Sequence, residues 1–210
     1  PPITILNPQP IGSCKEEHMN IKVIAIGAST GGTEAILDIL KKLPDGLPPI
    51  VITQHMPAGF TAMYAQRLDR ACAMKVKEAK DGDHLERGLA LVAPGGMQLK
   101  LTGNSSGLSV RVWPGKRLHG VAPAVDKLFH SAAKLAGSSA VGIILTGMGQ
   151  DGASGLLEMR RRGAYTIGQD KASCIVYGMP MAAYEMGAVC IQAPLSGIPA
   201  ILMNYLTRSS

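Results

Sequence analysis

The chain has 210 residues, 46% of them hydrophobic and 17% charged, which is enough for one hydrophobic core of ordinary size. Its net charge of +6 is spread over short groups of Lys and Arg without interleaved aromatic residues, which argues against a nucleic-acid-binding surface. No apolar run reaches the roughly 18 residues of a membrane helix and no signal peptide is recognisable, so we expect a cytoplasmic protein without membrane insertion.

Residues 1–20 contain four prolines and no sustained periodicity, so we interpret them as a linker or tail. From residue 21 onward, apolar runs that predict buried strands alternate with segments that have the 3.6-residue periodicity of helices. Strands are expected at 21–27, 49–54, 89–94, 141–146, 164–169 and 188–191. Helices are expected at 33–43, about 59–72, 123–136, about 153–162, 180–187 and about 195–206.

Two further segments, 97–102 and 108–113, alternate apolar and polar residues and are separated by GNSSG. This pattern predicts an antiparallel hairpin with one face in water. Elsewhere the alternation of strands and helices implies right-handed βαβ crossovers and a mainly parallel sheet with helices on both faces. We therefore predict an α/β fold: one doubly wound domain over residues 21–210 with an inserted antiparallel hairpin.

Three of the predicted strands end in loops with side chains suited to nucleophilic catalysis. Ser29 follows the first strand in GASTGG, His55 follows the second in QHMP, and Asp151 follows the strand at 141–146 in GMGQDG. In open α/β sheets, ligands bind beyond the carboxyl ends of the strands. We therefore predict a catalytic triad at this edge, in which the imidazole takes the serine proton and the carboxylate orients the imidazole.

The glycine-rich turn around Ser29 also predicts donors for an oxyanion. Backbone N–H groups of Thr30, Gly31 and Gly32 would face the charge that develops during attack. Gly27, Ser29 and Gly31 fit the G-x-S-x-G pattern of a nucleophile elbow, although so short a pattern also arises by chance. The order Ser, His, Asp along the chain differs from that of the α/β-hydrolases, so a triad here implies a different topology.

Each member of the predicted triad has a structural alternative. Ser29 and Asp151 precede predicted helices and are suited to cap them, and His55 also fits an ordinary loop histidine. His119, in RLHGVAP, is a weaker candidate for the lining of the cleft. A nucleotide-binding loop is disfavoured because the G-x-G-x-x-G spacing and a Walker lysine are missing, and Gln54 stands near the place of the expected acidic residue.

Seven stretches, in order, resemble the catalytic domain of the CheB-type chemotaxis receptor methylesterases, from about Ile21 to Leu206. They are VIAIGASTGGTEA, ITQHMPAGFT, VKEAKDG, LVAPGG, VDKLFHSAAKLAG, ILTGMGQDGA and ASCIVYGMP. The resemblance implies hydrolysis of γ-glutamyl methyl esters on the cytoplasmic helices of methyl-accepting chemotaxis receptors, with release of methanol, and deamidation of some receptor glutamines. It also implies a reaction without a metal or organic cofactor. A non-catalytic receptor-binding module and a nucleotide-binding module are the alternatives.

Carried over by motif, Ser29 matches the nucleophile of this family, His55 the base and Asp151 the acid, whereas Thr30 and Met148 match residues close to the nucleophile. We expect no metal ligands, because the four cysteines are far apart and form no C-x-x-C motif, and we expect their thiols to be reduced.

Two features depart from the family pattern. Members usually carry an N-terminal receiver domain, and no such domain precedes Ile21 in these 210 residues, so residues 1–20 resemble an interdomain linker. The family often has Arg-Pro in the stretch that corresponds to HGVAPAVD, where this chain has Ala122 before Pro123. The second departure bears on the choice of receptor and leaves the triad unchanged.

Overall fold

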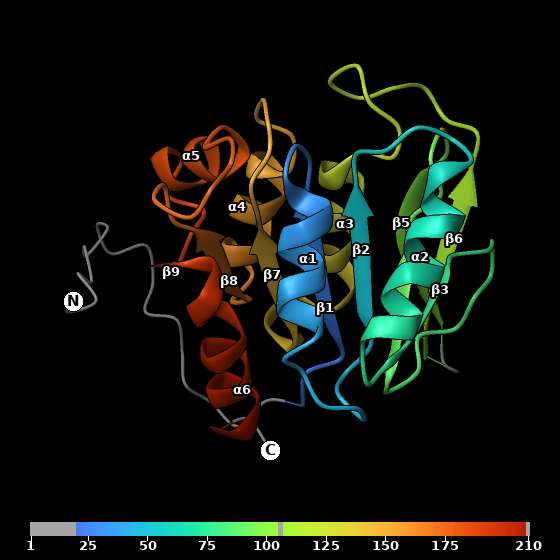
Figure 1. The fold of residues 1–210 in the computed structure, drawn as a ribbon, viewed down its shortest axis with the longest axis horizontal. Helices are drawn as coiled ribbons and strands as arrows, with labels where there is room; N and C mark the ends of the chain where they lie inside the picture. The colour runs from blue at the N-terminus through green and yellow to red at the C-terminus, as the bar shows by residue number, and fades with distance from the viewer. Residues whose placement is uncertain (1–19, 105–106, 209–210) are drawn as a thin grey trace.

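The computed structural model describes residues 20–104 and 107–208, so the predicted linker lies outside the described residues, apart from Asn20. A seven-stranded sheet of order β3-β4-β2-β1-β7-β8-β9 forms its centre, and every neighbouring pair is parallel (Figure 1). The strands are β1 Val23–Ala28, β2 Ile50–Gln54, β3 Lys75–Glu78, β4 Leu89–Val92, β7 Ala140–Ile144, β8 Tyr165–Gln169 and β9 Ile191–Ala193.

Helices cover both faces of this sheet. On one face lie α1 Gly32–Leu40, α2 Phe60–Ala71 and α6 Ile198–Arg208. On the other lie α3 Val125–Leu135, α4 Ala153–Arg161, α5 Met179–Glu185 and the antiparallel hairpin of β5 Gln98–Asn104 and β6 Gly107–Trp113. Short 3₁₀ turns, η1 Gly137–Ser139 and η2 Leu195–Gly197, precede β7 and α6. This architecture confirms the predicted doubly wound α/β fold with an inserted hairpin.

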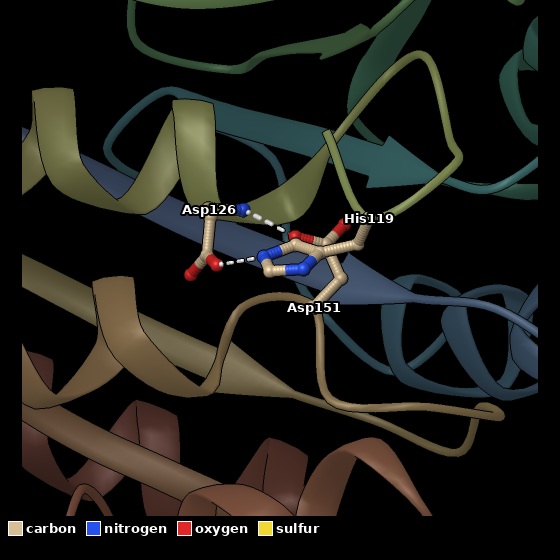
Figure 2. Close-up of side chains that lie close together, drawn as sticks. All are labelled: His119, Asp126 and Asp151. Carbon is tan, nitrogen blue, oxygen red and sulfur yellow. Dashed lines mark hydrogen bonds and ion pairs between the residues drawn. The ribbon is translucent and has the colours of Figure 1, made fainter. Parts of the chain in front are cut away.

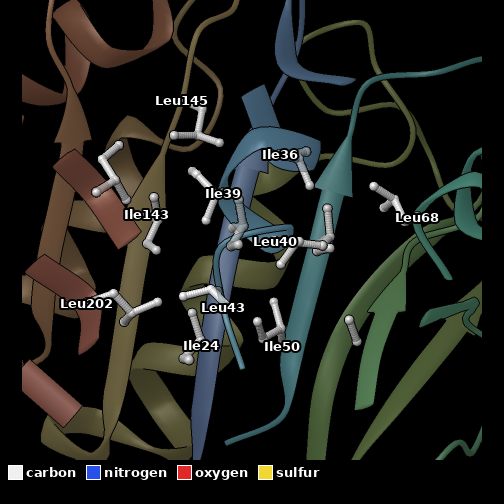
Figure 3. Close-up of a cluster of buried hydrophobic side chains, with 14 of the residues drawn as sticks. Ile24, Ile36, Ile39, Leu40, Leu43, Ile50, Leu68, Ile143, Leu145 and Leu202 are labelled. Atoms are coloured by element: carbon white, nitrogen blue, oxygen red, sulfur yellow. The ribbon is translucent and has the colours of Figure 1, made fainter. Parts of the chain in front are cut away.

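The apolar runs of the strands are explained by burial on both faces. Ile24 of β1 and Ile50 of β2 are fully buried on the side of α1, among the aliphatic side chains drawn in Figure 3. Ala25, the next residue of β1, is buried on the opposite side, against α3 and its neighbours. Each fully buried aliphatic side chain contributes about 1.5–3 kcal/mol. Because neither face of β1 or β2 is left in water, the alternation typical of half-exposed strands is absent from both.

The hairpin has the opposite pattern, as predicted. Leu99, Leu101 and Val110 are buried, whereas Lys100 and Arg111 are exposed. One face of the hairpin therefore packs on the core and the other faces solvent.

One strand was not predicted. β3 forms an edge of the sheet and has the sequence KVKE, of which only Val76 is buried. An edge strand needs little apolar surface, and its charged residues discourage pairing with another chain. Because β3 has only one buried residue, it lacks the apolar run by which the other strands were recognised.

The strand predicted at 188–191 begins three residues later, at Ile191. Ala188 and Val189 are buried, as their character suggested. Their carbonyls are bound by side chains: Thr166 donates to Ala188 O at 2.7 Å, and Arg160 donates to Val189 O at 3.1 Å. These side-chain bonds occupy the backbone groups that a strand would offer to its neighbour.

The cysteine prediction is correct only in part. Cys72 and Cys174 are free thiols, but Cys190 is disulfide-bonded, contrary to the expectation. Among the helices of residues 20–104 and 107–208, none has the length and apolar character required to cross a bilayer.

The strand order fixes where the chemistry lies. From β1 the chain runs outward through β2, and it later returns to the other side of β1 as β7, so the order reverses between β1 and β7. Ser29, His55 and Asp151 belong to the loops that follow β1, β2 and β7. The three residues therefore lie at the switch point, where doubly wound sheets bind their ligands.

Candidate active site

The turn that carries Ser29 is fixed by the backbone around it. Ser29 N donates to Thr146 O at 3.0 Å, and Ser29 O accepts from Gly32 N at 2.8 Å. Gly31 has φ 81°, and a Cβ there would lie 2.7 Å from Cγ1 of Ile175, so both conformation and space require glycine. Gly31 is the N-cap of α1 and no side chain caps this helix, so the alternative role of Ser29 as a helix cap is wrong.

His55 stands beside Ser29 at the end of the neighbouring strand. Ala28 pairs with Gln54 in the ladder of β1 and β2, and His55 N donates to Ala28 O at 3.0 Å. Ser29 and His55 each follow this last pair by one residue, so they leave the sheet from neighbouring strands, which are about 4.8 Å apart. The imidazole is 13% exposed, and its Nε2 lies 2.7 Å from Oδ2 of Asp151.

The structure thus joins two of the three predicted side chains by a direct hydrogen bond. The Ser29 hydroxyl forms no hydrogen bond with either partner among the described residues. With Nε2–H given to Asp151, Nδ1 of His55 keeps the lone pair that a general base needs. Catalytic hydrogen bonds are often long in enzymes without substrate and shorten in the complex.

Asp151 caps a helix, but not the one that it precedes. The N-cap of α4 is Gly152, and no side chain caps that helix. The carboxylate of Asp151 instead accepts Val125 N at 2.7 Å and Asp126 N at 3.0 Å, the first two N–H groups of α3. The carboxylate is 3% exposed and held from three directions, by these two donors and His55. It is therefore immobilised as a support for the imidazole.

A second His–Asp pair, His119 with Asp126, lies beside Asp151 (Figure 2). His119 Nε2 is 3.0 Å from Asp126 Oδ2, and Asp126 Oδ1 accepts Gly155 N at 2.7 Å. His119, Asp126 and Asp151 offer ligand atoms that all lie within 4.8 Å of one another, a group that could hold a metal ion. Each carboxylate oxygen of the group already has a partner nitrogen, however, so a metal ion would have to compete with these bonds. That the site uses no metal stays a prediction.

The predicted oxyanion donors differ in availability. Gly32 N is engaged by Ser29 O, whereas the N–H groups of Thr30 and Gly31 have no acceptor among the described residues. Thr30 is exposed, and its carbonyl is held by Thr146 Oγ1 at 2.9 Å. Two oriented N–H groups next to a serine can stabilise the oxyanion that forms when it attacks.

Met148 lies on the open side of the site and is 71% exposed. It follows Gly147, where a Cβ would lie 2.7 Å from Cβ of Ser29. Any residue other than glycine at 147 would therefore displace Ser29. Met148 is thus held close to Ser29 while its own side chain faces solvent.

Cys174 carries a thiol near Thr146. Burial raises the pKa of its thiol to about 11. The thiolate is the reactive form of cysteine, and a thiol with this pKa is almost entirely protonated at neutral pH. Cys174 is therefore not suited to replace Ser29.

Sequence reasoning missed three residues that shape the site: Gln54, Thr146 and Gly147. Gln54 is the last residue of β2 and Thr146 lies two residues after β7. Both are buried polar residues, with exposures of 3% and 1%. A polar side chain at the carboxyl end of a buried strand was the available signal, because such a group must find a partner. The partner itself could not be read from the sequence.

Comparisons with known proteins identify the family and the fold of this chain. The model of a family described as CheB methylesterase matches residues 24–202. The crystal structure of the Thermotoga maritima CheB methylesterase catalytic domain is similar to this structure, with a TM-score of 0.85 and 37% sequence identity. The match covers 87% of this chain and 97% of that one.

Two curated relatives are named protein-glutamate methylesterase/protein-glutamine glutaminase. The one from Syntrophomonas wolfei, designated 2, is 55% identical over 186 residues, which is 89% of this chain and 54% of that protein. The one from Escherichia coli K12 is 50% identical over 177 residues, which is 84% of this chain and 51% of that protein. The chain thus spans about half the length of the curated relatives that it matches.

Proposed function

The chain belongs to the CheB methylesterase family, and we propose that it is a serine hydrolase that removes methyl groups from glutamyl methyl esters of chemotaxis receptors. The products are methanol and glutamate, and the reaction serves chemotactic adaptation. The hydrogen-bonded pair of His55 and Asp151, one strand away from Ser29, carries this proposal. The names of the relatives support the substrate class and also glutaminase activity.

In the first half of the reaction, Ser29 Oγ attacks the ester carbonyl while Nδ1 of His55 takes the hydroxyl proton. The oxyanion that forms accepts hydrogen bonds from the N–H groups of Thr30 and Gly31. Asp151 stabilises the imidazolium through its bond to Nε2. When the intermediate collapses, the bond to the methoxy oxygen breaks, His55 returns the proton to it, and methanol leaves an acyl-enzyme.

In the second half, a water molecule attacks the acyl carbonyl and gives a proton to His55. Collapse of the second intermediate breaks the bond to Ser29 Oγ, and His55 reprotonates the serine. The glutamate acid that is released then ionises. Deamidation of a glutamine follows the same path with ammonia as the first leaving group, because only the group protonated by His55 changes.

The remaining assignments belong to the same proposal. Residues 21–210 form the catalytic domain, and the family match over 24–202 supports this boundary. The catalytic residues are Ser29, His55 and Asp151. The protein acts in the cytoplasm, on the cytoplasmic helices of methyl-accepting receptors. The reaction uses no metal or cofactor. Receiver domains are partners of this family's catalytic domain.

Release of methanol tests the substrate. Receptors with radiolabelled methyl groups are incubated with the protein, and volatile methanol is counted. Wild-type protein is expected to release the label, and Ser29→Ala is expected to release none above the background. Equal release by both variants, or none by either, would refute the proposed reaction.

A serine-directed fluorophosphonate tests the nucleophile separately. It forms a bond to an activated serine whatever the natural substrate is, and peptide mapping identifies the labelled residue. Labelling at Ser29 that disappears in His55→Ala is the expected result. An unlabelled Ser29 in a protein that retains a nucleotide on purification would favour the nucleotide-binding alternative, and an unlabelled Ser29 in a protein that binds receptors would favour a non-catalytic module.

A further inference from the structure

Gln54 connects the nucleophile and the base of the proposed reaction. It is the last residue of β2 and is 3% exposed. Its amide Nε2 donates to Ser29 O at 2.8 Å and to His55 O at 3.1 Å. One amide group therefore binds the backbone of both residues, although Gln54 and Ser29 are 25 residues apart along the chain.

The surroundings of Gln54 are shaped to admit this side chain. A Cβ on Gly32 would lie 2.2 Å from Gln54 Oε1, so any other residue at the start of α1 would push the amide away. Oε1 itself is buried and has no hydrogen-bond partner among the described residues. A buried acceptor without a partner is costly. The amide therefore has a buried Oε1 without a partner, while its Nε2 donates to the carbonyls of Ser29 and His55.

A second side chain holds the same turn from the opposite strand. Thr146, which follows β7, donates from Oγ1 to Thr30 O at 2.9 Å. The turn of Ser29 is therefore fixed on the side of β2 by Gln54 and on the side of β7 by Thr146. Gln54 differs in that it also reaches the base, because His55 is its own neighbour in the chain.

We propose that Gln54 is a positioning residue, which sets the placement of Ser29 relative to His55 through their two carbonyls. This inference rests on the proposed serine hydrolase function. Gln54 does not touch the reacting atoms. A displacement of about 1 Å in a catalytic arrangement can lower a rate about 100-fold, and the two loops have to meet without a direct side-chain bond between Ser29 and His55.

The test is the rate at which a fluorophosphonate labels Ser29 in Gln54→Met. Methionine has a similar length and is apolar, so it fills the space but donates no hydrogen bond. The saturation kinetics of labelling separate the affinity for the probe from the rate constant of attack. We expect the rate constant to fall about 10- to 100-fold and the affinity to stay within about twofold.

Thr166→Val is the matched control. Thr166 in β8 is buried and also makes two hydrogen bonds to the backbone, with Ala188 O at 2.7 Å and Cys190 N at 3.0 Å, away from Ser29 and His55. Both variants are expected to lose thermal stability, and only Gln54→Met is expected to lose labelling rate. If Gln54→Met fails to fold, Gln54→Glu, which has the same shape, is measured instead with the same expectation.

The outcomes separate this inference from the proposed function. A labelling rate of Gln54→Met within twofold of wild type, a change in probe affinity alone, or an equal loss in Thr166→Val would each overturn the role of Gln54. If wild-type protein labels at Ser29 but releases no methanol from receptors, the proposed substrate fails while the role of Gln54 is still measured. If wild-type Ser29 does not label, both fail.

Discussion

Two His–Asp pairs lie side by side at the carboxyl edge of the sheet, and they are built alike. His55 with Asp151 and His119 with Asp126 are bonded through Nε2, at 2.7 Å and 3.0 Å. Both carboxylates are buried, with side-chain exposures of 3% and 4%. What differs is the origin of the histidine. His55 follows β2, next to the strand that ends in Ser29, whereas His119 comes from the irregular segment between β6 and α3 and is 38% exposed.

The carboxylates also support each other's helices. Asp151, just before α4, binds the first two N–H groups of α3, and Asp126, in the first turn of α3, binds Gly155 N in α4. This exchange ties the two helices together at the edge where the site lies. The comparison teaches that a buried Asp–His pair is not by itself a catalytic pair. The pair of His55 and Asp151 has its proposed role because the strand order places His55 next to Ser29.

The largest effect is expected from His55→Ala. Without a general base, Ser29 loses the group that takes its proton, and loss of the histidine of a serine triad lowers kcat on the order of 10⁶-fold. Methanol release from labelled receptors measures this effect. A residual rate above about one per cent of wild type would show that another group serves as the base.

Asp151→Asn should follow, with a loss of about 10⁴-fold in kcat, because an amide no longer holds the imidazole in the required tautomer. The amide also cannot accept all three of the bonds that the carboxylate accepts now, so stability should fall by about 1–3 kcal/mol. Single-turnover kinetics and urea unfolding measure the two effects. Unchanged turnover would contradict the assignment of this carboxylate.

Asp126→Ala should separate stability from activity. It leaves Gly155 N in α4 without an acceptor, which is expected to cost about 1–3 kcal/mol of unfolding free energy. Asp151 keeps its backbone donors, the N–H groups of residues 125 and 126, and its bond to His55. Turnover should therefore fall less than about 10-fold. Urea unfolding and methanol release are compared in the same preparation. A loss close to that of Asp151→Asn would make the two pairs functionally equivalent and refute the comparison.

His119→Ala should change turnover little. The imidazole is partly exposed, and the backbone of His119 has φ 53°, which alanine adopts only at a cost. Loss of the imidazole leaves the buried Oδ2 of Asp126 without its nitrogen partner, which is expected to cost about 1–3 kcal/mol of unfolding free energy, and turnover should stay within about threefold. If turnover instead falls 100-fold with unchanged probe labelling of Ser29, then His119 contacts the receptor.

The smallest effect concerns Cys174. Because burial raises the pKa of its thiol to about 11, the thiolate fraction at pH 7 is lower than in a free cysteine and increases as the pH rises toward that value. Iodoacetamide at pH 7 should therefore alkylate Cys174 slowly and leave the labelling of Ser29 unchanged. Mass spectrometry across a pH series measures the alkylation. Rapid modification at pH 7 would contradict the expected protonation.

The boundaries of most elements could be predicted because they depend on neighbours in the chain. The run of apolar residues before Gly27 predicts a strand, and the spacing of Ile36, Ile39 and Leu40 predicts a helix face. β3 was missed because KVKE carries one buried residue and its place at the edge depends on β4. The predicted start of β9 was wrong because distant side chains, from Arg160 and Thr166, occupy its backbone.

The sequence by itself determined the alternation of strands and helices and put Ser29, His55 and Asp151 after the strands that carry them, since these are local patterns. Only the tertiary structure decided that Asp151 binds α3 rather than its own helix, and that Gln54 reaches across to Ser29. Both bonds join residues about 25 positions apart. The hydrogen-bonding needs of a buried polar group are fixed by its chemistry, but its partner is fixed by which distant segments packing brings within 3 Å.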